Sequence, residues 1–172
     1  MRSVSCAGAR GTGGSLGKVE MPTPVYEVVF FDLGGTLIEE PPKRTWVPGA
    51  RATLSSVRGK GFRLGVISNT GTLDRSQLLA LLPPDFDLAQ FEDRLIVLSS
   101  EVGVEKPALK IFRIAVARAG IEPHKCLFCT EDLLHTLAAQ QVGMHVARLQ
   151  KPPNSDVGEL PAVLDQLESL AF

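Results

Sequence analysis

A single carboxylate, Asp32, directly follows the apolar run from Val28 to Phe31. Four consecutive apolar residues are typical of a central strand covered on both faces. Asp32 is therefore expected at the carboxyl end of a buried strand, where open α/β sheets bind their ligands. Gly34 and Gly35 follow, and glycines let a backbone turn tightly around a bound group. Asp32 is a candidate nucleophile, although an aspartate that merely opens a loop is the common alternative.

Polar groups also follow the second expected strand, at Ser68, Asn69 and Thr70. Two hydroxyls, an amide and nearby peptide N–H groups are the donors that a phosphoryl oxygen needs. The alternative is that the same residue types only start a turn.

Lys106 stands between Glu105 and Pro107, where the pattern predicts the first turn of a helix. A cation is electrostatically unfavourable at that end of a helix, so this placement calls for a compensating anion. The alternative is a solvated lysine paired with Glu105.

Two adjacent carboxylates, Glu131 and Asp132, come at the end of a fourth apolar run. Together with Asp32 they could supply the hard oxygen ligands that Mg²⁺ prefers. Asp132 is an equally natural cap for a helix that starts at Leu133.

The elements that must position these residues alternate between strands and helices, which indicates an α/β fold with a parallel sheet and helices on both faces, Rossmann-like in three layers. Strands are expected at 28–31, 62–67, 95–98, 125–129 and 145–149. Helices are expected after Pro48, over 73–82, with Pro107 in the first turn of the next one, and over 133–142 and 160–170.

Composition limits the function classes. The 172 residues carry a net charge of −1, which favours one domain and argues against a protein that binds nucleic acid by neutralising phosphates. No run reaches the length of a membrane span. Residues 1–20 read as a disordered leader and 21–172 as the folded domain. Cys126 and Cys129 are expected on opposite faces of a strand as core residues, in a reducing, cytoplasmic compartment.

The order of these sites along the chain resembles the haloacid dehalogenase-like (HAD) superfamily. The resemblance runs from Val25 to about Leu149. Receiver domains also combine an aspartate, a hydroxyl and a lysine, but they place an acidic pair first and the phosphorylated aspartate on a middle strand, so the order seen here disfavours them. Its four motifs are matched by residues 30–37 (FFDLGGTL), 66–69 (VISN), 103–107 (GVEKP) with 111–112, and 127–132 (LFCTED) with 143–144.

The resemblance implies a magnesium-dependent hydrolase in which Asp32 attacks phosphorus to form an aspartyl phosphate that water hydrolyses. Lys106 would neutralise nucleophile and phosphate. The phosphorylated substrate would contact Lys106 and residues from two loops, and the metal would be held by Asp32, the Gly34 carbonyl and a fourth-motif carboxylate, Glu131 or Asp132. The two loops contribute Gly34, Gly35, Thr36, Ser68 and Asn69.

Two departures from the family pattern accompany the resemblance. Gly34 stands where most family phosphatases carry a second aspartate, the general acid, whose contribution is typically about 10² to 10⁴ in rate. Counting back from Gly143 aligns Thr130 with the usual metal aspartate and His135 with a downstream one, whereas the acidic pair selects Glu131 and Asp132. A catalytically silent protein that binds a phosphorylated ligand or a protein partner is therefore the alternative.

Members of the family insert a cap domain either after the first motif or between the second and third motifs. Here the stretch from Leu37 to the second strand and the stretch from Asn69 to Lys106 are both too short for a sizeable cap domain. Capless relatives have open sites and act on large substrates or close the site by association, so a larger phosphorylated substrate and a homo-oligomer are expectations beside a phosphorylated small molecule. Trp46 or the loop over 39–42 could wall part of the cleft.

Overall fold

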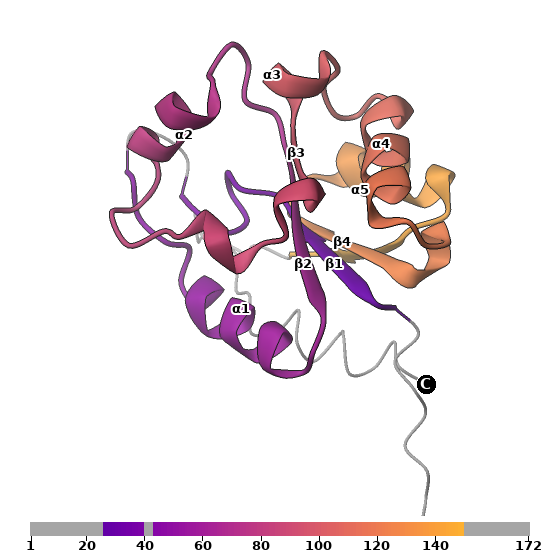
Figure 1. The fold of residues 1–172 in the computed structure, drawn as a ribbon, viewed down its shortest axis with the longest axis horizontal. Coiled ribbons are helices and arrows are strands. Elements are labelled where there is room, and N and C mark those ends of the chain that lie inside the picture. The colour runs from indigo at the N-terminus through magenta and orange to yellow at the C-terminus, as the bar shows by residue number, and fades with distance from the viewer. Residues whose placement is uncertain (1–25, 40–42, 150–172) are drawn as a thin grey trace, which may run out of the picture.

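A computed structural model describes residues 26–39 and 43–149, whose strands form one five-stranded parallel sheet (Figure 1). The strand order is β3-β2-β1-β4-β5, so β1 is central and the order along the chain reverses beside it. The predicted α/β fold is confirmed. The strands are β1 (Val28–Phe31), β2 (Arg63–Ser68), β3 (Ile96–Leu98), β4 (Cys126–Thr130) and β5 (His145–Arg148).

Helices cover both faces of the sheet, as predicted. Figure 1 shows α1 on one side and α4 and α5 on the other. Because side chains alternate along a strand, Val29 and Phe31 pack in the core with α1, whereas Val28 and Phe30 pack with α4 and α5. The helices are α1 (Ala50–Gly59), α2 (Arg75–Leu81), α3 (Ser99–Val102), α4 (Leu109–Ala119) and α5 (Leu133–Val142), with 3₁₀ turns η1 (Leu88–Gln90), η2 (Asp93–Leu95) and η3 (Pro123–Lys125).

Two helices begin later than their sequences predict. In α2, Asp74 and Gln77 form a reciprocal capping box, which fixes the start at Arg75 instead of Leu73. In α4, the N–H of Ala108 donates to the Glu105 carbonyl at 3.0 Å, and this turn separates Lys106 and Pro107 from the helix. The prediction that Pro107 lies in the first helical turn is therefore wrong.

Both cysteines of β4 are free and buried, and they lie on opposite faces of the sheet, Cys126 with the α4 side and Cys129 with the α1 side. Burial raises the pKa of Cys126 to about 11, so its thiol stays protonated at neutral pH. Their predicted role in core packing is confirmed.

Several expectations concern parts of the chain outside the described residues. The leader over 1–20 and the helix over 160–170 lie there. Within 26–39 and 43–149, none of the helices has the length and apolar character needed to cross a membrane.

Candidate functional site

Asp32 lies directly beyond β1, the central strand, at the carboxyl end of the sheet. Its N–H donates to the Cys129 carbonyl at 2.9 Å, which continues the β1–β4 pairing by one residue. The carboxylate is only 7% exposed, and its Oδ1 accepts the N–H of Leu33 at 2.8 Å. The strand and the first turn of the following loop thus fix this carboxylate in place.

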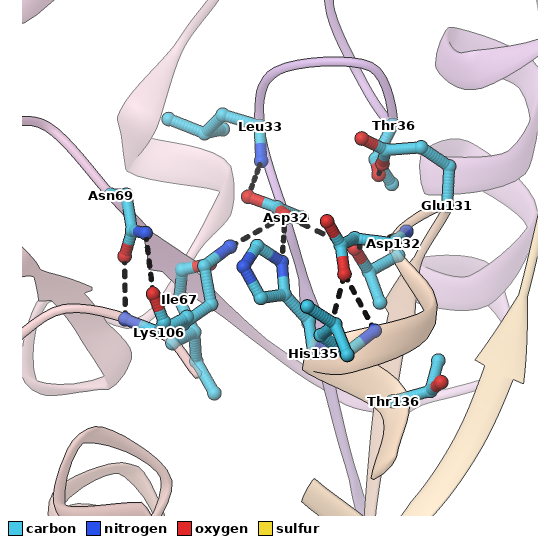
Figure 2. A network of polar contacts seen from close by, with 12 residues as sticks. Asp32, Leu33, Thr36, Ile67, Asn69, Lys106, Glu131, Asp132, His135 and Thr136 are labelled. Carbon is cyan, nitrogen blue, oxygen red and sulfur yellow. Dashed lines mark hydrogen bonds and ion pairs between the residues drawn. The ribbon is translucent and has the colours of Figure 1, made fainter. Parts of the chain in front are cut away.

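The sequence predicts that Lys106 needs a compensating anion, and in the structure this anion is Asp32. Lys106 Nζ lies 2.5 Å from Asp32 Oδ2, and its side chain is 1% exposed (Figure 2). The same ammonium donates to the Ile67 carbonyl at 3.0 Å, at the end of β2. The alternative of a solvated lysine paired with Glu105 is therefore wrong, because residues 105–108 turn the lysine into the protein before α4 begins.

Two further groups contact Oδ2 of Asp32. The Thr130 hydroxyl donates to it at 3.1 Å, and Nδ1 of His135 lies 3.5 Å away without a hydrogen-bond partner among the described residues. Burial opposes ionisation of Asp32, but the Lys106 ammonium and the His135 imidazole outweigh burial and lower the pKa of this carboxyl. Asp32 is therefore an ionised carboxylate at neutral pH, as a nucleophile must be.

The two residues of the second motif have different surroundings. Ser68 is the last residue of β2 and is buried at the same edge of the sheet as Asp32. The Asn69 amide makes two hydrogen bonds with the backbone of Lys106, donating to its carbonyl at 2.9 Å and accepting its N–H at 2.8 Å. The Asn69 side chain therefore positions the loop that carries Lys106. Only the backbone of Asn69 is then left for the predicted phosphoryl contact.

The loop after Asp32 packs against Glu131. Gly35 has a φ of +68°, which favours glycine, and a Cβ at this position would force the Glu131 carboxylate to move. The Gly35 N–H donates to the Ile38 carbonyl at 2.8 Å, and the Thr36 hydroxyl donates to Glu131 Oε2 at 2.5 Å. Gly35 and Thr36 therefore bond within the protein, and their contact with substrate stays a prediction.

The fourth motif divides its residues among three tasks. Thr130 ends β4, and its hydroxyl donates to Asp32. Glu131 reaches to Thr36, and Asp132 caps α5 (Figure 2). Asp132 Oδ1 accepts the N–H groups of Leu134 at 2.7 Å and His135 at 3.0 Å, so the capping interpretation of Asp132 is confirmed. Of these three residues, the one bonded to Asp32 is Thr130, which counting back from Gly143 selects.

The oxygen donors of these loops suit magnesium in their chemistry. Among the described residues no three His, Cys, Asp or Glu side chains converge as a ready metal centre. Magnesium usually takes only one or two protein carboxylates and completes its shell with water and substrate oxygens. The Asp32 carboxylate, the Gly34 carbonyl and Glu131, which packs against Gly35, are such donors on adjoining loops. Asp132 is turned instead to the amino end of α5.

A cavity of about 410 Å³ opens beside this site. Trp46, a predicted wall, is not among its lining residues; its indole N–H donates to Asp85 at 2.8 Å and its ring stacks on Phe86. The other suggested wall, the loop over 39–42, contributes Glu39, and 40–42 lie outside the described residues. The lining comes from the loop after β1, the end of β2 and the α2 region: Leu33, Gly34, Ile38, Glu39, Arg44, Ser68, Asn69, Thr70, Leu73, Leu78, Leu81 and Leu82.

Sequence reasoning missed the contacts of Thr130 and His135 with Asp32 and the place of Arg44 at the cavity. Thr130 carried a usable signal: it follows an apolar strand as Asp32 does, and parallel pairing in register brings the two together. The family alignment marks His135 only as the residue at the position of a downstream aspartate, and no pattern marks Arg44, because their positions depend on how α5 and the loop before α1 pack.

Comparisons with known proteins agree with this architecture. No protein-family model matches the chain. It is 37% identical over 91 residues to a glyceraldehyde 3-phosphate phosphatase of Methanothermobacter thermautotrophicus, a match that covers 51% of this chain and 38% of that protein. It is 38% identical over 100 residues to the haloacid dehalogenase-like hydrolase domain-containing protein 3 of Xenopus laevis, covering 58% of this chain and 38% of that protein. The chain thus spans about two fifths of the length of these relatives.

A solved structure shares the fold. It is a HAD family enzyme from Bacteroides thetaiotaomicron in complex with magnesium and inorganic phosphate, with a TM-score of 0.61 at 16% identity, covering 75% of this chain and 96% of that one. That likeness shows the fold alone, and membership of the family rests on the two sequence relatives.

Proposed function

Since the chain belongs to the haloacid dehalogenase-like superfamily, we propose that it is a phosphohydrolase with Asp32 as its nucleophile. The observation that carries the proposal is the buried pair of Asp32 and Lys106 at the carboxyl end of the central strand. An ionised carboxylate beside a buried ammonium and next to a cavity is suited to attack phosphorus in a dianionic substrate.

The reaction would have two steps at Asp32. Oδ1 accepts one hydrogen bond, from Leu33, whereas Oδ2 contacts Lys106 and Thr130, so Oδ1 has the free lone pair for phosphorus. An Oδ1–P bond forms as the bond from phosphorus to the leaving oxygen breaks, and that oxygen takes a proton from water. A second water then attacks phosphorus, and its proton neutralises the hydroxide left by the first step. The Oδ1–P bond breaks, and inorganic phosphate and the Asp32 carboxylate are released.

The remaining residues would hold charge in place. Lys106 would offset the charge that builds on Asp32 and the phosphoryl oxygens, held there by Asn69 and the Ile67 carbonyl. Ser68 and the Asn69 backbone would donate to phosphoryl oxygens. Magnesium, bound by Asp32, the Gly34 carbonyl and Glu131, would supply further positive charge to those oxygens.

The substrate is proposed to be a phosphorylated small molecule, as the name of the Methanothermobacter relative suggests for that protein. The free thiols of Cys126 and Cys129 support a reducing, cytoplasmic location.

A second candidate is a silent phosphate-binding protein. It is favoured by Gly34, Thr130 and His135, which put no carboxylate where the resemblance leads one to expect it. Turnover of 4-nitrophenyl phosphate with magnesium, measured as released nitrophenol, separates the two candidates. If the protein is a hydrolase, the wild type should turn over the substrate at a rate well above that of Asp32→Asn, because the amide is a poor nucleophile. Equal rates for the wild type and Asp32→Asn would reject the hydrolase and support the silent phosphate-binding protein.

Beryllium fluoride gives a second readout for the same site. We expect it to bind Asp32 as a mimic of the aspartyl phosphate and to raise the melting temperature of the wild type in the presence of magnesium. Asp32→Asn should show no such shift. Ser55→Ala, at an exposed position on α1, serves as a control and should behave as the wild type.

A further inference from the structure

We infer that the cavity beside Asp32 is a subsite for an apolar leaving group, and that the substrates are aryl phosphate monoesters. This inference rests on the proposed function and adds the substrate class to it. Two independent observations support it: the chemistry of the cavity wall and the absence of an acid at position 34.

The cavity connects the phosphoryl end of the site to α2. One end is formed by Gly34 in the loop after β1, by Ser68 at the end of β2 and by Asn69, which follows it. The volume of about 410 Å³ is within the range of small-molecule pockets, roughly 300 to 1,000 Å³. A phosphoryl group at Asp32 would therefore direct its organic group into this space.

The surface of the cavity is largely apolar. A sugar or glycerol moiety placed there would leave its hydroxyls without partners, at a cost of about 1 to 3 kcal/mol for each buried group. An aromatic ring would bury apolar surface against the same side chains. Those side chains are Leu33, Ile38, Leu73, Leu78, Leu81 and Leu82.

The two charged residues that line the cavity already have partners. Arg44 donates to the Leu82 carbonyl at 3.4 Å. Glu39 accepts the Thr45 hydroxyl at 2.5 Å and contacts Lys43 at 3.5 Å. Both charged side chains are therefore held by contacts within the protein.

Leaving-group chemistry points to the same class. Gly34 cannot donate a proton to the departing oxygen, so the leaving group must be stable as an anion. A phenol has a pKa of about 10, as the tyrosine side chain shows. Water, whose acidity resembles that of an alcohol, has a pKa of about 15.7. Aryl phosphates therefore depend least on the missing acid, and they also fit the apolar wall.

Helix α2 provides a matched pair of variants for the test. Leu81 lines the cavity and is 44% exposed, whereas Leu79 does not line it and is 41% exposed. Glutamine at either position is neutral, so it adds no charge next to an anionic ligand. Because both side chains are already half exposed, neither substitution removes a core residue.

The first measurement is binding of two phosphonates that cannot be hydrolysed, by calorimetry. Benzylphosphonate and methylphosphonate carry the same anionic group and differ in the ring. The wild type should bind benzylphosphonate about tenfold more tightly, as expected from burial of the ring. Leu81→Gln should lower this ratio about threefold, and Leu79→Gln should leave it unchanged. Equal affinity for the two phosphonates in the wild type overturns the inference.

The second measurement is turnover of phenyl phosphate against glycerol phosphate. The wild type should prefer phenyl phosphate in kcat/KM, and Leu81→Gln should reduce the preference through KM. Turnover of both substrates at equal kcat/KM removes the subsite while the hydrolase stands. A ring preference in binding without turnover of either substrate removes the hydrolase and keeps the subsite.

Discussion

Thr130 lies beside Asp32 at the centre of the sheet, and its hydroxyl donates to Oδ2 of the carboxylate at 3.1 Å. The parallel pairing of β1 with β4 sets this relationship. Phe31 lies opposite Cys129, so the next residues along the chain, Asp32 and Thr130, also lie side by side. The fourth-motif residue beside the candidate nucleophile thus carries a neutral hydroxyl.

Replacing Thr130 by aspartate should strengthen magnesium binding. A second carboxylate beside the ionised Asp32 adds a hard ligand and negative charge, so calorimetry with magnesium chloride should show affinity about tenfold above the wild type. Thr130→Val removes the hydroxyl, which donates to Asp32 and accepts the Asp132 N–H at 3.3 Å. It should cost about 1 to 2 kcal/mol in unfolding free energy and bring no gain in magnesium affinity. Equal magnesium affinity in the two variants would contradict the expectation.

Removal of the Lys106 charge should destabilise the fold strongly. Lys106→Met leaves the Asp32 carboxylate buried without its cation, which typically costs about 3 to 5 kcal/mol. Urea unfolding of the double variant Asp32→Asn with Lys106→Met should recover most of this loss, because no uncompensated charge remains. If the double variant is as unstable as Lys106→Met alone, the ion pair is not the cause.

Gly35 should tolerate alanine less well than another glycine with the same backbone angle. Gly103 has a φ of +66° with nothing near its missing Cβ, whereas Gly35, at +68°, packs against Glu131. Gly103→Ala should cost about 1 to 2 kcal/mol from backbone strain alone. Gly35→Ala should cost about 1 to 3 kcal/mol more, from overlap with the carboxylate. Thermal unfolding of the two variants compares them, and equal costs would argue against the tight Gly35–Glu131 packing.

The pair of Arg63 and Glu92 should make stability depend on acid pH. The guanidinium of Arg63 donates to both Glu92 oxygens, at 2.7 and 2.9 Å, and these hydrogen bonds lower the pKa of Glu92 despite some burial. A carboxyl whose pKa is lower in the folded protein stabilises it above the unfolded pKa, about 4.3. This contribution is lost as the pH falls through the folded pKa.

Chemical unfolding of the wild type and Glu92→Gln across pH 7 to 3 measures this contribution. The wild type should be the more stable at pH 7, and the difference should shrink toward zero as the pH falls below about 4.3. A difference that does not change with pH would mean that the pair contributes through packing instead of charge.

Local patterns in the sequence were sufficient for the strands and for the opposite orientations of Cys126 and Cys129, because apolar runs and their alternation report burial residue by residue. They were also sufficient to place Asp32 at a strand end and to indicate that Lys106 needs an anion. The expected sites for the starts of α2 and α4 were wrong by a turn or less, because caps and turns formed by Asp74 and Glu105 decide where a helix begins.

The sequence by itself determined the sheet, its apolar strands and the polar residues that follow them, since these depend on neighbours along the chain. Only the tertiary structure decided that Lys106 meets Asp32, that Thr130 stands beside it while Glu131 reaches Thr36, and that Asp132 caps α5. It also decided that α2 encloses an apolar cavity next to Ser68. These relationships join residues far apart in the chain, and no spacing within one segment encodes the distance between two loops that a sheet brings together.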